Sequence, residues 1–184
     1  MAEGYSDIAH STYSEWKANT IGRAFDLDGS YGCQCWDYAS LFWRNVGFPA
    51  GYPQTGDGNA YGCWTLRRDV NAGTEFDLIY DKTQIQEGDI IVMNGTSSNP
   101  PGHITFADEN YNGTDSIRCL GQNQGGSPQP GGGTAVTLNT LGLGDFLGAF
   151  RYKNWHSTPP TPTFSTHRFK WVLYAKHLRN RSNM

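Results

Sequence analysis

Residues 32–39 read Gly-Cys-Gln-Cys-Trp-Asp-Tyr-Ala, and they predict the start of a helix directly after a glycine-bearing loop. Apolar residues follow at helical spacing from Trp36 to Trp43, and Gly47 ends the pattern. Because Cys35 opens this helix, the free backbone N–H groups and the positive end of the helix dipole favour its thiolate. The stretch therefore predicts a nucleophilic cysteine at position 35.

Strand patterns follow the helical ones along the chain. A first helix is expected over residues 7–19, where apolar side chains share one stripe before Gly22. Residues 48–64 are rich in glycine and aromatic residues and are expected to form a loop. Strands are expected within residues 87–93, 102–107, 116–120 and 147–152, where β-branched or alternating apolar residues gather. Helices first and antiparallel strands afterwards indicate an α+β fold.

The chain of 184 residues is long enough for one domain with a short appendage. A domain is expected over residues 1–155, followed by a Pro/Thr-rich linker at 156–163. Residues 164–184 then form a tail with aromatic residues, five basic residues and no acid. The net charge of −3 gives the chain no electrostatic footprint for nucleic acid, and no apolar run approaches the roughly 18 residues of a membrane span.

A thiolate nucleophile needs a base beside it, and His103 is the candidate. In the alternating strand 102–107, His103 projects away from the face that carries Ile104 and Phe106. The imidazole in turn needs an acceptor to orient it, and Asn123 is placed for this after the next strand. A cysteine or a histidine alone is more often a packing residue, so the prediction depends on the three residues occurring in this order.

Four segments together resemble the CHAP family, the cysteine- and histidine-dependent amidohydrolases/peptidases. They are Gln34-Cys35-x-Asp37-Tyr38, Gly88-Asp89-Ile90-Ile91-Val92, Gly102-His103-Ile104 and Gln122-Asn123, in the family's order within residues 5–155. The resemblance implies a papain-like fold in which N-terminal helices pack on an antiparallel sheet. It also implies cleavage of peptidoglycan, by N-acetylmuramoyl-L-alanine amidase or peptide-bridge endopeptidase activity, as in many bacteriophage lysins.

By position, the resemblance makes Cys35 the nucleophile, His103 the general base and Asn123 the orienting group. Lytic relatives often carry Glu two residues before that Asn, where this chain has Gly121. Either Asn123 serves alone, or a neighbour such as Gln122 contributes. The backbone N–H of Cys35 is expected to supply one donor to the oxyanion.

An acidic loop, residues 26–32, precedes Cys35, and Asp37 follows it. Counted from Asp26, oxygen-bearing residues occur at the 1, 3, 5, 7 and 12 spacing of a calcium loop. The candidate ligands are Asp26, Asp28, Ser30, Gly32 and Asp37. Oxygen-only ligands favour Ca²⁺ over Zn²⁺. Calcium-dependent CHAP lysins carry a similar arrangement, so the resemblance implies a structural Ca²⁺ that braces the start of the Cys35 helix.

Other interpretations remain open from sequence. A zinc site would draw on Cys33, Cys35, Cys63, Cys119 and His103, although Cys-x-Cys is tighter than the usual ligand spacing. The enzyme could instead act on a small intracellular amide such as glutathionylspermidine, or the domain could be a non-catalytic wall-binding or virion module.

The preferred hypothesis is a phage peptidoglycan hydrolase that acts on bacterial peptidoglycan. The basic tail at 164–184 is expected to dock on the domain, to begin a truncated binding module, or to bind anionic wall polymers through its charge. Residues 1–16 lack the basic and apolar regions of a secretory signal. The expected route is therefore from the host cytoplasm to the wall through a holin pore, or carriage on a virion.

Overall fold

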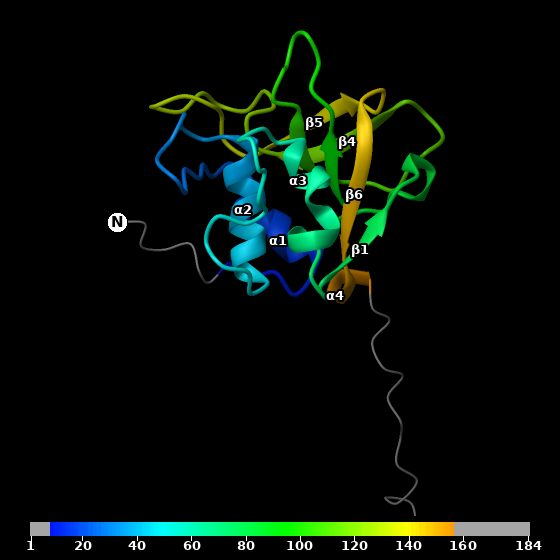
Figure 1. The fold of residues 1–184 in the computed structure, drawn as a ribbon. Coiled ribbons are helices and arrows are strands. Elements are labelled where there is room, and N and C mark those ends of the chain that lie inside the picture. Colours follow the sequence, from blue (N-terminus) through cyan, green and yellow to red (C-terminus); the bar gives the residue numbers. More distant parts are fainter. Residues whose placement is uncertain (1–7, 157–184) are drawn as a thin grey trace, which may run out of the picture.

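A six-stranded antiparallel sheet is the centre of the protein (Figure 1). The structure is a computed structural model and describes residues 8–156. The strands pair in the order β1-β6-β2-β3-β4-β5, and every neighbouring pair is antiparallel. Their bounds are β1 (Phe76–Ile79), β2 (Ile90–Met93), β3 (His103–Ala107), β4 (Ser116–Gly121), β5 (Thr137–Gly142) and β6 (Phe146–Tyr152). The α+β prediction is confirmed.

Helices cover one face of this sheet, and α2 packs directly against β3. The helices are α1 (Tyr13–Thr20), α2 (Cys35–Asn45), α3 (Gly62–Thr65) and α4 (Lys153–His156), with a π-helical turn at Arg67–Asn71 and a 3-10 turn at Lys82–Gln84. The first helix starts later than the predicted residue 7, because Thr12 caps it: the Thr12 hydroxyl accepts from the Glu15 backbone N–H at 3.1 Å. In return, the Glu15 carboxylate accepts from the Ser11 N–H at 2.9 Å.

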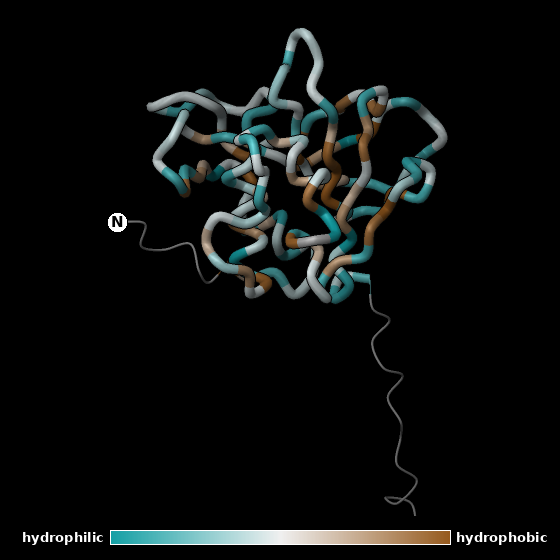
Figure 2. Tube along the Cα trace, in the orientation of Figure 1, coloured by the Kyte–Doolittle hydropathy of each residue, from teal (hydrophilic) through white to brown (hydrophobic). Residues whose placement is uncertain are grey.

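The core between helices and sheet is largely aromatic. Phe42 of α2 makes ring contacts with Trp16 of α1 and with Phe106 of β3, at centroid distances of 5.1 and 5.4 Å. A second apolar cluster covers the other face and includes Ile91, Ile117 and several neighbours. Both faces of the central strands are therefore buried, and Figure 2 shows apolar residues concentrated along them. This explains why β2 is a continuous apolar run.

Regular structure also occurs where none was predicted: in β1, β5, α3 and α4, and in the two short turns at Arg67–Asn71 and Lys82–Gln84. β1 pairs with β6 at one edge of the sheet, and β5 pairs with β4 at the other. α3 falls inside the expected loop 48–64. β1 and α3 have only four residues each, and β5 is a half-exposed edge strand, so none carries a strong periodic signal.

The expected domain boundary lies where the described residues end. His156 is the last residue of α4, whereas the linker was expected to begin there. The remainder of that linker and the basic tail lie outside the described residues. Among the described helices, none is long and apolar enough to cross a membrane.

Candidate active site

Cys35 is the first residue of α2, as the sequence predicts. Gln34 precedes it in an extended conformation (φ −93°, ψ 162°), and its backbone N–H donates to the Asp37 carboxylate at 2.8 Å. This contact ties the residue before Cys35 to the first turn of the helix. The Cys35 side chain is mostly buried, yet it lines an open cleft, so the sulfur can meet a substrate.

The structure brings Cys35 and His103 together, with the thiol hydrogen-bonded to the imidazole. Burial alone would raise the pKa of the Cys35 thiol, but the charge and hydrogen bond of His103 hold it below its ordinary value. Burial would likewise lower the pKa of His103, yet the facing thiolate and its hydrogen bonds raise it. Each group therefore stabilises the charged form of the other, which favours the thiolate and the imidazolium.

Gln124 makes the orienting contact to the imidazole. Its Oε1 lies 3.0 Å from His103 Nε2, and it also accepts from the Thr105 hydroxyl at 2.9 Å. Its Nε2 donates to the backbone carbonyls of Cys119 and Thr137, each at 3.0 Å. These two donations fix which end of the amide faces His103. His103 Nε2 must therefore be the protonated nitrogen, which leaves Nδ1 for Cys35.

Asn123, which the sequence predicted in the orienting role, lies elsewhere. Its side chain is exposed, and its Nδ2 donates to Gln34 Oε1 at 2.8 Å. The backbone explains this: Asn123 has a left-handed conformation (φ 59°), which turns the chain just after β4. Gln124 then lies under the imidazole in its place. No signal in the sequence separated Gln124 from its two amide neighbours.

Gln122, the other neighbour considered from sequence, has a structural role. Its side-chain amide donates to the carbonyls of Phe25 and Gln34 at 2.7 and 2.8 Å, and its Oε1 accepts from the Phe25 N–H at 2.8 Å. This buried side chain ties the end of β4 to the loop that precedes α2.

The acidic loop and the first turn of α2 bring three of the five predicted metal ligands together. Carboxylate oxygens of Asp26, Asp28 and Asp37 all lie within 4.8 Å of one another. Asp37 is buried, and burial together with the charges of Asp28 and Asp26 raises its pKa to about 6, against the lowering effect of hydrogen bonds from the Leu27 and Gln34 backbone. Such a set of like charges suits a hard divalent cation.

The other two predicted ligands lie on the same loop. The Ser30 backbone N–H donates to the Asp28 carboxylate at 2.8 Å, and Ser30 lines the cleft. Gly32 has a left-handed backbone (φ 71°) between Tyr31 and Cys33.

A glycine-rich segment, residues 125–133, packs backbone to backbone against this acidic loop. The Cys33 N–H donates to the Gly132 carbonyl at 3.0 Å, and Cys33 forms a parallel β-bridge with Gly133. A Cβ at Gly32 would lie 2.5 Å from the Gly132 oxygen, and one at Gly133 would lie 1.9 Å from the Cys33 oxygen. Only glycine permits this close approach.

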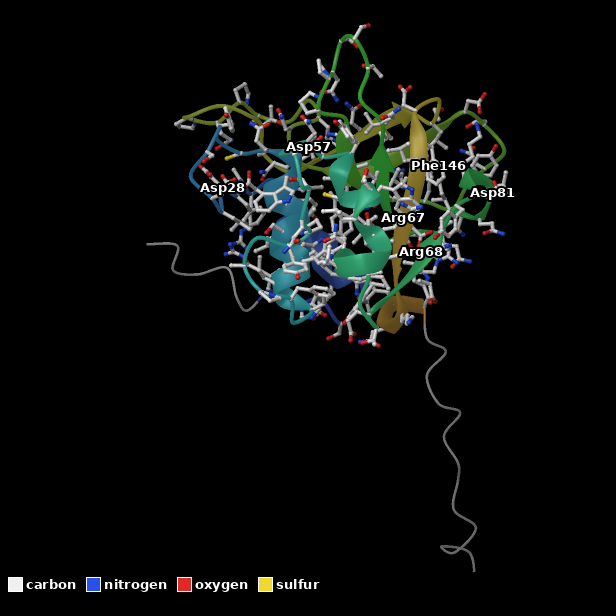
Figure 3. The ribbon with its side chains drawn as sticks, in the orientation of Figure 1. Asp28, Asp57, Arg67, Arg68, Asp81 and Phe146 are labelled. Atoms are coloured by element: carbon white, nitrogen blue, oxygen red, sulfur yellow. The ribbon has the colours of Figure 1, made fainter. Side chains whose placement is uncertain are left out.

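The cleft beside Cys35 has a volume of about 930 Å³. It is lined by residues of the acidic loop, the start of α2 and loop 55–60, and by Gly131 of the glycine-rich segment. Tyr31 stands at its rim with 88% of its surface exposed. Figure 3 shows Asp28 and Asp57, which both line the cleft, on separate segments of the chain.

The four cysteines are all reduced. Within residues 8–156, the three aspartates form the one cluster of His, Cys, Asp or Glu side chains whose ligand atoms are close enough to share a metal. The zinc arrangement considered from sequence is therefore not formed in this part of the chain.

The α+β fold and the Cys35–His103 pair at a helix start define a cysteine-dependent class of domain. Residues 25–123 match the CHAP domain family, and the chain belongs to it. The predicted resemblance is confirmed.

A D-alanyl-L-alanine endopeptidase of Streptococcus phage B30 is 34% identical over 121 residues, which cover 64% of this chain and 26% of that protein. This chain thus matches about a quarter of the relative's length. Among solved structures, the endolysin LysIME-EF1 superposes with a TM-score of 0.60 at 23% identity, over 82% of this chain and 64% of that one. This likeness supports the fold.

Proposed function

We propose that this domain hydrolyses an amide bond of bacterial peptidoglycan by a Cys-His thiol mechanism. The observation that carries the proposal is the hydrogen-bonded Cys35–His103 pair, in which Cys35 lines the cleft and Gln124 lies behind the imidazole. The name of the phage B30 relative supports a peptide endopeptidase activity. The alternative bond within the same substrate is the one cut by an N-acetylmuramoyl-L-alanine amidase.

The reaction begins when the Cys35 thiolate attacks the carbonyl carbon of the scissile amide. Negative charge moves to the carbonyl oxygen, and the Cys35 backbone N–H at the start of α2 is placed to donate to it. Imidazolium His103 then gives its Nδ1 proton to the departing amine, the C–N bond breaks, and a thioester remains on Cys35.

Neutral His103 completes the cycle. It takes a proton from water, and the hydroxide attacks the thioester carbonyl. The C–S bond breaks, which releases a carboxylic acid and restores the thiolate and imidazolium. Throughout these steps Nε2–H stays hydrogen-bonded to Gln124 Oε1, so the ring keeps one orientation.

A structural calcium ion is part of this proposal. Asp26, Asp28 and Asp37 would hold it, and Ser30 and Gly32 are the further ligands predicted from sequence. When bound, the ion would offset the repulsion among the three carboxylates and brace the loop. Since Asp37 also accepts from the Gln34 N–H, this loop positions the residue before the nucleophile.

The direct test is clearing of purified Gram-positive cell walls, followed by mass spectrometry of the released fragments. We expect the wild type to clear the suspension and Cys35→Ala to leave it turbid with an unchanged melting temperature. New amino and carboxyl termini within the peptide would identify an endopeptidase, whereas free lactyl groups would identify an amidase. Equal clearing by a folded Cys35→Ala protein would overturn the mechanism.

Two other results would favour the alternative functions considered from sequence. Binding to walls without released fragments would favour a non-catalytic module. Hydrolysis of a soluble thiol conjugate such as glutathionylspermidine, without any action on walls, would favour the small-amide substrate.

A further inference from the structure

The described residues that line the cleft include acids but no lysine, arginine or histidine. The acids are Asp28, Asp37 and Asp57. Asp28 and Asp37 belong to the aspartate cluster of the acidic loop. Asp57 lies on another segment, outside this cluster, so its charge is available to a partner other than an ion held by the cluster (Figure 3).

The Asp57 carboxylate is held in one orientation. Its Oδ2 accepts from the Tyr61 hydroxyl at 2.6 Å, and its Oδ1 accepts from the Asn59 backbone N–H at 3.0 Å. Asn59 Nδ2 in turn donates to the Tyr61 hydroxyl at 3.3 Å. These hydrogen bonds, with that of Tyr61 first, keep the pKa of Asp57 below its usual value, so the group is an anion at neutral pH.

No ion pair within residues 8–156 neutralises this anion. Its two hydrogen bonds come from neutral donors, and the side chain is exposed. A carboxylate fixed by neutral partners at the wall of a cleft retains acceptor capacity for a cation.

The segment that carries Asp57 is hydrogen-bonded to chain neighbours of both Cys35 and His103. The Trp36 indole N–H, next to Cys35, donates to the Pro53 carbonyl at 2.7 Å. The Tyr61 N–H donates to the Pro101 carbonyl at 3.2 Å, two residues before His103. Because these contacts lie on either side of Asp57, its position relative to Cys35 and His103 is fixed.

We propose that Asp57 is a specificity-determining residue that binds a primary ammonium group of the substrate. The inference rests on the proposed function and names the substrate class within it: wall peptides that carry a free amino group near the cleaved amide. The hydrogen bond would be N⁺–H to carboxylate, the charge-assisted type that orients a substrate as well as attracting it. Asp57 is a binding residue and takes no part in proton transfer.

The test compares purified Gram-positive walls with the same walls N-acetylated by acetic anhydride, which removes the ammonium charge. We expect the wild type to clear untreated walls about fivefold faster, the size of one partly exposed ion pair. Asp57→Asn should clear both substrates at the slower rate. The difference seen with the wild type should shrink as salt is added.

Asp81→Asn is the matched control. Like Asp57, Asp81 is exposed and accepts through Oδ1 from the backbone N–H two residues on, at 2.9 Å from Thr83, but it is not among the residues that line the cleft (Figure 3). This variant should keep the wild-type preference for untreated walls. A melting temperature and a Cys35 alkylation rate equal to those of the wild type will show that Asp57→Asn is folded with an intact nucleophile.

Two results would overturn the assignment. One is equal clearing of both substrates by the wild type, and the other is an undiminished preference in Asp57→Asn. Failure of the proposed function gives a different result, since neither wall would then be cleared by the wild type any faster than by Cys35→Ala, and the inference would fall with it.

Discussion

The amide of Gln124 presents its oxygen to His103 Nε2 at 3.0 Å and cannot be reversed without losing two other hydrogen bonds. The orienting partner of the base is thus a neutral side chain. It selects the tautomer of the imidazole, as a carboxylate would, but adds no negative charge of its own. The positive charge of His103 depends mainly on the Cys35 thiolate.

Gln124→Leu should lower kcat by about 100-fold, since the imidazole loses the acceptor that holds its orientation. Asn123→Ala is the control, because Asn123 contacts Gln34 rather than the imidazole, and it should retain most of the activity. Wall-clearing rates at saturating substrate check both. The reverse pattern, with Asn123→Ala inactive and Gln124→Leu active, would return the orienting role to Asn123.

Gln124→Glu should move the alkaline limb of the pH–rate profile to higher pH. A carboxylate beside Nε2 favours the imidazolium, so the His103 pKa rises further and the protonated form persists to higher pH. The profile of kcat between pH 5 and 10 measures this shift. A limb unmoved or displaced toward acid would contradict the assigned contact.

Alkylation by iodoacetamide should be fastest at Cys35 and should persist below the pH range of an ordinary thiol. His103 lowers the pKa of Cys35, whereas burial first of all raises those of Cys33, Cys63 and Cys119, the last to about 12. Mass spectrometry of the modified peptides over a pH series measures each rate.

The same series in His103→Ala provides the control. Without the imidazolium, burial dominates at Cys35, so its alkylation should move to alkaline pH. An unchanged pH dependence in a folded His103→Ala protein would show that the two residues are not coupled.

Calcium should raise the melting temperature of chelated protein. At a concentration 100 times its dissociation constant, a bound ion adds about 2.7 kcal/mol to the free energy of unfolding. For a chain of this size that corresponds to about 5–10 °C. Asp26→Asn should abolish the shift, and scanning calorimetry with and without Ca²⁺ measures it. A calcium shift of the same size in Asp26→Asn would remove Asp26 from the ligand set.

Asp89→Ala should lower the free energy of unfolding by about 3 kcal/mol, because it removes the buried carboxylate that pairs with the half-buried Arg151 guanidinium. Arg151 donates to both oxygens of Asp89, at 2.8 and 2.7 Å, and its side chain is 17% exposed. The exposed pair of Lys153 and Asp77, 3.5 Å apart, gives the control. Asp77→Ala should cost less than about 1 kcal/mol in the same urea titration. Equal losses in both variants would contradict the role of burial.

Gly133→Ala should destabilise the protein far more than Gly22→Ala. Both glycines have left-handed backbones (φ 71° and 79°), so both variants lose about 1–2 kcal/mol to backbone strain. A Cβ at Gly22 meets no atom within 4 Å, whereas at Gly133 it would overlap the Cys33 carbonyl. Urea titration separates the two effects, and equal midpoints would show that the backbone contact is dispensable.

The sequence predicted Cys35 and His103 but not the residue that orients the imidazole. Cys35 at a helix start and His103 on an alternating strand follow from local patterns, and the structure brings them together. Gln124 does not follow from such a pattern, because three amide residues occur in a row. The choice among them depends on the left-handed turn at Asn123, which is fixed by tertiary contacts.

In the fold, likewise, the central strands were predicted and the edge strands were not. β2 and β3 were predicted because each is a strong apolar or alternating run buried in the middle of the sheet. The edge strands β1 and β5 depend on partners far along the chain, Tyr152 for Phe76 and Leu120 for Leu138. Their own residues are too few or too polar to indicate a strand.

The contact between Gly32 and residues 131–133 also limits how the cleft can be redesigned. Two segments that line the cleft, the acidic loop and the glycine-rich segment, meet there through backbone atoms. An engineer who exchanges the acidic loop with that of another lytic enzyme must therefore transplant the glycine-rich segment with it. The two segments act as one structural unit, whereas the exposed side chain of Tyr31 can be changed without altering the contact between them.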